Sequence, residues 1–161
     1  MLSTRIILES IGQSIVDQLK NDIKTKSLVA GFPPPNASGA LYDSIRYEAT
    51  EDSLKVYALD YIYYLVHGRK AGKKPPRAVI RKWIDDKGIL PQADASGRTI
   101  SKESLAFLIQ RKIGDKGTLI AQQGGSDLLS SILTESFIQN VKDELIFNTV
   151  NAIKSEILAI A

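Results

Sequence analysis

The side chain in this sequence best suited to chemistry is its single histidine, His67. An imidazole can act as a general base near neutral pH, but catalysis also needs a nucleophile or acid held beside it, and no such pattern surrounds His67. Its apolar setting, after Tyr64-Leu65-Val66 and before a glycine, favours a structural role. With one histidine and no cysteine, the chain has no two-histidine zinc site, disulfide framework or cysteine nucleophile.

Two further groups resemble ligand sites only in part. Asp85 and Asp86 could contact a cation, but no oxygen-rich loop surrounds them, which favours a solvated helix end. Gly68, Gly72 and Lys73 suggest a phosphate cradle, yet they lack the strand, the G-x-x-x-x-G-K-[ST] spacing and the following helix of a P-loop. The sequence therefore predicts a protein that is not an enzyme, with no catalytic residue, no cofactor and no metal site.

Positive charge is concentrated in one segment. The net charge of the chain is only +3, but residues 69 to 82 carry seven basic residues and no acid, which leaves the rest of the chain net acidic. Such a segment is either a solvated loop or a site for a polyanion or an acidic protein surface. The seven residues are Arg69, Lys70, Lys73, Lys74, Arg77, Arg81 and Lys82.

Aromatic residues accompany this basic segment. Tyr61, Tyr63 and Tyr64 precede it and Trp83 follows it. Aromatics beside Lys and Arg are found in nucleic-acid sites, where they stack on bases. In so apolar a stretch, however, tyrosines more often belong to a core or a protein interface. We expect interface tyrosines, and we expect Trp83 to anchor its helix to the core.

Length and composition indicate one ordinary globular domain spanning residues 1–161. The chain is 43% hydrophobic and 24% charged, close to the average for globular proteins. No apolar run approaches the roughly 20 residues needed to cross a bilayer. The N-terminus also lacks the pattern of a secretory signal, so we expect no membrane partner and a cytosolic product.

Hydrophobic periodicity predicts an α+β fold. Its long N- and C-terminal helices should pack on a small antiparallel β-sheet, with short helices in the middle. We expect a helix over 3–27, a loop at 31–36, and strands over 41–49 and 54–59 joined by a turn at 50–53. Within 60–68 we expect a short helix rather than a third strand. The next expected elements are a helix that ends at Gly88, a polar connection over 90–100, and a helix closed by the glycines at 114 and 117. A last helix should run from about residue 132 to the end, and the sequence leaves open whether it is broken near its start.

Four stretches, in this order, resemble the minor tail-component family of tailed double-stranded-DNA bacteriophages, whose members act in tail completion and head-to-tail joining. They are SGALYDSI (38–45), YIYYLVHGRKAGKKPP (61–76), IRKWI with KGI (80–84 and 87–89), and LAFLIQRKI with KGT (105–113 and 116–118). Family members often carry an acid just before the loop glycine, where this chain has Val66 and His67.

The resemblance implies a structural virion protein, located in the neck or tail of the particle and in the host cytoplasm during assembly. It implies a homo-oligomeric ring around the DNA channel, with neighbouring phage neck or tail proteins as partners. The hairpin would add to a sheet across subunits, and the loop from Gly68 to Pro76 would dock on a neighbouring ring or make non-specific contact with channel DNA. Because that DNA must slide, we favour docking on protein.

A different class remains as the alternative. A stand-alone, non-enzymatic nucleic-acid-binding protein would use the basic segment 69–82, in particular Lys73, Lys74 and Arg77 together with Tyr64.

Overall fold

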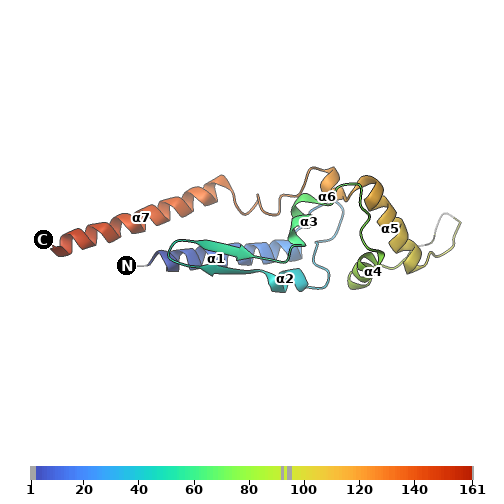
Figure 1. Cartoon of the computed structure of the whole chain (residues 1–161), viewed down its shortest axis with the longest axis horizontal. Helices are drawn as coiled ribbons and strands as arrows, with labels where there is room; N and C mark the ends of the chain where they lie inside the picture. Colours follow the sequence, from blue (N-terminus) through green and yellow to red (C-terminus); the bar gives the residue numbers. More distant parts are fainter. Residues whose placement is uncertain (1–2, 92, 94–95, 161) are drawn as a thin grey trace.

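A computed structural model describes residues 3–91, 93 and 96–160 of the chain, and it is drawn in Figure 1. The fold is α+β as predicted, with long first and last helices, a two-stranded antiparallel sheet and short helices between them. The elements are α1 (Thr4–Thr25), α2 (Ala40–Ser44), β1 (Arg46–Ala49), β2 (Leu54–Tyr57), α3 (Ile62–His67), α4 (Arg77–Asp86), α5 (Lys102–Lys116), α6 (Leu119–Gln122) and α7 (Glu135–Ile160).

Helix α1 forms where the apolar spacing predicted it. The Ser3 hydroxyl accepts a hydrogen bond from the Ile6 amide at 3.4 Å and caps the N-terminus. Leu8, Ile11, Leu19 and Ile23, from the predicted stripe, are buried. α1 is therefore the element on which the hairpin and the first half of α7 pack.

The hairpin pairs β1 with β2 and lies against α1. Arg46 is paired with Tyr57 and Ala49 with Leu54, and the residues of the predicted turn join the strands. At Gly12 of α1 the hairpin approaches so closely that a β-carbon would lie 2.6 Å from the Tyr47 ring and 2.7 Å from a Leu54 methyl. Because Gly12 has no side chain, the two-stranded sheet can pack closely on α1, and this packing gives the hairpin the support that two strands alone lack.

The prediction of a strand from residue 41 was wrong, because residues 40–44 form helix α2. Gly39, at a φ of +83°, begins the helix, and the Ser44 hydroxyl donates to the Leu41 carbonyl at 2.7 Å. Leu41 and Ile45 are both buried, a spacing of four that suits a helix. The alternation of side chains that is typical of a strand begins only at β1.

The middle of the chain contains more helix than predicted. α3 confirms the expected short helix and excludes a third strand there. α5 continues through the buried Gly114 and ends at Gly117, where φ is +76°. Of the two glycines predicted to close this helix, Gly117 does so and Gly114 does not. The short helix α6 was not predicted; the Thr118 hydroxyl caps it by accepting from the Ala121 amide at 3.4 Å. Of the predicted connection over 90–100, residues 92, 94 and 95 lie outside the described residues, as do Met1 and Leu2 of the N-terminus.

The buried side chains form separate clusters. The largest joins α1 to the segments around α2, α3 and Leu128, and a second lies at the start of α1. α4 and α5 pack on each other through a small core of their own, made by Ile80, Ile84 and Ala106. Trp83 does not belong to it: 38% of its surface is exposed, so the prediction that it anchors α4 was wrong.

Helix α7 begins after a break. Residues 128–133 form turns, and the Thr134 hydroxyl accepts from the Phe137 amide at 3.2 Å at the start of the helix. Phe137, Val141 and Leu145, in the first half of α7, pack on the buried cluster at the start of α1. The second half extends past the start of α1 along the long axis of the molecule (Figure 1). None of the described helices has the length and apolar character to span a membrane.

Candidate functional site

The basic loop, residues 68–76, is strapped to the C-terminal half of α5. The Gly72 amide donates to the Gly114 carbonyl at 2.7 Å, and the Gln110 side-chain amide donates to the Pro75 carbonyl at 2.8 Å. At the other end, Arg69 and Thr118 exchange two hydrogen bonds of 2.8 Å each. The loop therefore presents its side chains from a fixed backbone, although its glycines and prolines suggested flexibility.

Neutralisation reduces the number of free cations in the basic segment. Arg77 and Arg81 face Glu103 at 4.0 and 2.7 Å, and Lys82 contacts Asp86 at 2.9 Å. The Arg69 guanidinium donates to the Lys73 carbonyl at 3.2 Å and lies 5.8 Å from the centre of the Tyr64 ring.

Three lysines of the basic segment have no acidic partner among the residues that the structure describes. Lys70, Lys73 and Lys74 are exposed, and the stem of Lys74 lies against Gly114 of α5. They form the docking triad, the portion of the predicted basic site that is available to a partner. Its charge lies at the C-terminal end of α5, where a cation also complements the helix dipole.

The three predicted interface tyrosines are exposed, so a place in the core is excluded for them. Tyr61, Tyr63 and Tyr64 expose 43%, 59% and 44% of their surface. Partial burial of the Tyr61 phenol raises its pKa, because desolvation disfavours the charged form.

Two of these tyrosines line a shallow hollow. The rings of Tyr63 and Tyr64 meet edge to face at 5.7 Å. With Ala58, Asp60 and Ile62 they line an open depression of about 440 Å³. We call these five residues the tyrosine hollow. Its mixture of apolar wall, aromatic rings and one carboxylate is typical of a protein contact rather than of a catalytic centre.

The candidate catalytic and ligand groups do not come together. The His67 ring lies 4.6 Å from the Tyr63 ring, and its nitrogens make no hydrogen bond in the described chain. Asp85 accepts a hydrogen bond from Lys102 at 2.6 Å, which holds the pKa of its carboxyl below the ordinary value. The Gly72 amide is already bonded to α5, so the suggested phosphate cradle lacks that donor. Among the described residues no cluster of three metal-ligating side chains occurs.

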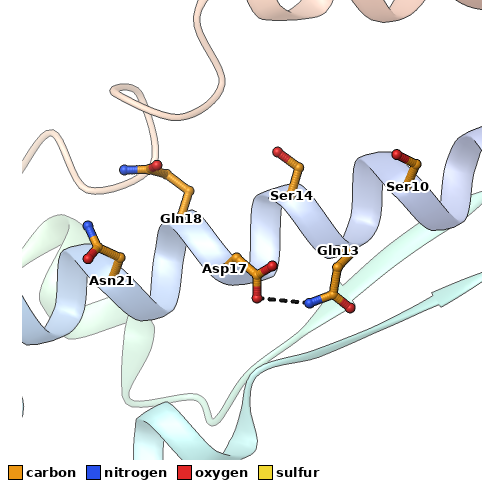
Figure 2. Close-up of a pocket in the computed structure, with 6 residues that line it drawn as sticks. All are labelled: Ser10, Gln13, Ser14, Asp17, Gln18 and Asn21. Carbon is orange, nitrogen blue, oxygen red and sulfur yellow. Dashed lines mark hydrogen bonds between the residues drawn. The ribbon is translucent and has the colours of Figure 1, made fainter.

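A polar groove runs along the exposed face of α1. Figure 2 shows its lining, all from one helix, with the Gln13 side chain donating to Asp17 at 2.8 Å. Its only charged group is Asp17, and it holds no histidine, lysine or arginine. The groove is therefore a solvated helix face. The lining residues are Ser10, Gln13, Ser14, Asp17, Gln18 and Asn21.

The second half of α7 carries an apolar surface that sequence reasoning did not single out. Ile146, Val150, Ile153 and Ile157 follow a 4-3-4 spacing and expose 42–61% of their surface. We call these four residues the outer stripe; Phe147 and Leu158, still more exposed, lie beside it. The periodicity was visible in the sequence, but a stripe that will be buried has the same spacing as one left uncovered.

Comparison of this chain with protein-family models, with curated proteins and with solved structures finds no match.

Proposed function

We propose that this chain is a structural virion protein of a tailed double-stranded-DNA bacteriophage, acting in tail completion or head-to-tail joining as a subunit of a ring around the DNA channel. The proposal draws on the four stretches that resemble the minor tail-component family. They run from just before α2 to Thr118, which precedes α6, and they include the basic loop and three residues of the tyrosine hollow, Ile62, Tyr63 and Tyr64.

The observation that carries the proposal is the amount of apolar surface left uncovered at two places where no chemistry-bearing group gathers. Single exposed apolar residues are ordinary on a protein surface. Contiguous apolar patches of several hundred Å² are rare on proteins that act alone, and they mark contacts with other proteins. In the outer stripe four apolar side chains at helical spacing are each exposed by 42–61%, and in the tyrosine hollow two exposed aromatic rings lie side by side. A protein that works by assembling accounts for them better than an enzyme does.

In this proposal the docking triad contacts a neighbouring neck or tail protein. Reversing its charge, with Lys73→Glu and Lys74→Glu, removes the electrostatic match to that partner but leaves every backbone hydrogen bond of the strap in place. We expect a folded subunit and an accumulation of unjoined heads and tails. Electron microscopy of lysates and a count of infectious particles measure this.

The matched control reverses Lys55 and Lys142, which are exposed and lie on the hairpin and on α7. It changes the net charge by the same amount away from the triad, and it should give joined particles. Normal particles from the Lys73/Lys74 variant would refute the docking role, and a particle reconstruction without this subunit in neck or tail would refute the virion assignment.

A second candidate function is sequence-independent binding of nucleic acid. The observation that favours it is the Arg69 guanidinium, 5.8 Å from the exposed Tyr64 ring, on the same loop as the three lysines of the triad. Cations neutralise phosphates and aromatic rings stack on bases. Binding through the triad would weaken with salt, with a logarithmic slope of about −0.7 to −0.9 per phosphate neutralised. A stable monomer with such affinity for DNA, and with no place in a particle, would favour this candidate over the ring subunit.

A further inference from the structure

The outer stripe of α7 faces away from the body of its own chain. At about 100° per residue, Phe137, Val141 and Leu145, which pack on α1, are centred roughly 150° around the helix axis from the outer stripe. Asn148 and Ala152 continue the inner face and are half-buried. The body of the same copy therefore cannot cover the outer stripe while the first half of α7 stays packed on α1.

The tyrosine hollow is formed around α3, which lies in the middle part of the long axis, while α4 and α5 lie at the end opposite the second half of α7 (Figure 1). In Figure 1, α3 sits beside the C-terminal end of α1, whereas the second half of α7 extends past the start of α1. The two uncovered apolar surfaces of one copy cannot reach each other. A contact between them must join two copies, and it leaves one unused surface of each kind at the ends of the pair.

The two surfaces complement each other in shape and in charge. The outer stripe is a convex ridge with Lys154 on the Phe147 side and Glu156 on the opposite side. The hollow is concave and contains the carboxylate of Asp60. The Arg69 guanidinium, 5.8 Å from the Tyr64 ring, supplies a cation beside it. Lys154 therefore has an acidic counterpart in Asp60 of the hollow, and Glu156 has a basic counterpart in Arg69 beside it. Such charge complementarity favours the correct partner and register.

We propose that the outer stripe of one copy docks into the tyrosine hollow of the next copy. This contact is heterologous, so it propagates from copy to copy until a rotation closes it into a ring. It depends on the proposed function only for the statement that the ring lies in a virion. The contact covers both apolar surfaces with one interface, whereas pairing of two α7 helices through their outer stripes would leave the tyrosines exposed.

Two variants, each with one surface disabled, test the contact in the purified full chain. Ile146→Ser with Ile153→Ser removes the apolar ridge, and Tyr63→Ser with Tyr64→Ser removes the aromatic wall of the hollow. All four side chains are exposed by 44–61%, so both variants should fold, which circular dichroism checks. Sedimentation velocity should find concentration-dependent oligomers for the unaltered protein and monomers for each variant alone.

Mixing the two variants gives the decisive measurement. Each variant keeps the surface that the other has lost, so an equimolar mixture should form a one-to-one dimer and nothing larger. Self-association of the Tyr63/Tyr64 variant would overturn the proposal in favour of pairing between α7 helices. Self-association of both variants would overturn it in favour of another surface, and a monomeric unaltered protein at every concentration would overturn it outright.

Charge exchange supplies a second readout that does not depend on truncating apolar groups. Lys154→Glu should weaken the association roughly two- to fivefold, as expected for an exposed ion pair, and adding Asp60→Lys should restore it. No restoration would contradict the proposed register. The two proposals can fail separately: the mixing experiment can succeed for a protein that particle imaging does not find in a virion, and imaging can find a neck subunit whose copies meet through other surfaces.

Discussion

Replacing Gly68 by alanine tests how closely the end of α3 approaches α6. Gly68 has a φ of +71° and a ψ of −177°, a region that is accessible almost only to glycine, so a side chain there costs about 1–3 kcal/mol. A β-carbon would also lie 2.7 Å from the Cα of Ala121 and closer still to its backbone nitrogen. Backbone cannot move aside as a flexible side chain can, and such overpacking costs about 1–3 kcal/mol more.

The two costs together predict a loss of about 2–6 kcal/mol in the free energy of unfolding. Total stabilities of about 5–15 kcal/mol are usual, so the loss is a large share, and it corresponds to a fall in Tm of roughly 2–4 °C per kcal/mol for a chain of this size. Urea unfolding followed by circular dichroism measures it.

Gly31→Ala is the matched control. Gly31 also has a positive φ, of +79°, but a β-carbon there would meet nothing within 4 Å. Its replacement should cost only the backbone penalty of about 1–2 kcal/mol, and both alanines lower the entropy of the unfolded chain equally. Equal losses for the two variants would refute the close approach of α3 to α6.

Two further predictions concern stability. Ile84→Ala should cost about 2–5 kcal/mol, because Ile84 is fully buried in the α4–α5 core, whereas Trp83→Ala, at an exposed position, should cost clearly less; the reverse order in urea unfolding would show that Trp83 is the anchor after all. Lowering the pH should remove stability through Asp85 and Asp127, whose carboxyl pKa values are held below the ordinary value by hydrogen bonds from Lys102 and Lys26. Such carboxylates stabilise the fold fully above about pH 4, and their contribution disappears as the pH falls through their lowered folded-state pKa values. The double variant Asp85→Asn with Asp127→Asn should therefore show a smaller change in the midpoint of urea unfolding between pH 2 and 7 than the unaltered protein.

The sequence predicts the fold well where periodicity is long and local signals agree. Helix α1 has a repeated apolar stripe and a capping serine, and the hairpin has alternation on both sides of a polar turn. The prediction for residues 40–44 was wrong because periodicity cannot distinguish a helix of five residues from a strand. The prediction for Trp83 was wrong because its helical spacing is compatible with both the buried and the exposed face of α4. Which of these faces is buried depends on where α5 packs.

The candidate site was predictable only in part. The basic segment is evident from composition, but Glu103, which neutralises Arg77 and Arg81, lies more than twenty residues away along the chain. The number of free cations therefore depends on the packing of α5 against α4. The outer stripe of α7 could not be recognised as exposed, because only the position of α1 shows which apolar positions of the helix are covered.

The separate core of α4 and α5 bears on how this protein can diverge. Ile80, Ile84 and Ala106 share no buried cluster with the side chains that hold α1, the hairpin and α7 together. Substitutions inside this core, which supports the surface that carries the docking triad, leave the packing of the other buried clusters unchanged. A lineage could therefore adapt this end to a new neighbour while selection preserves the remainder of the protein.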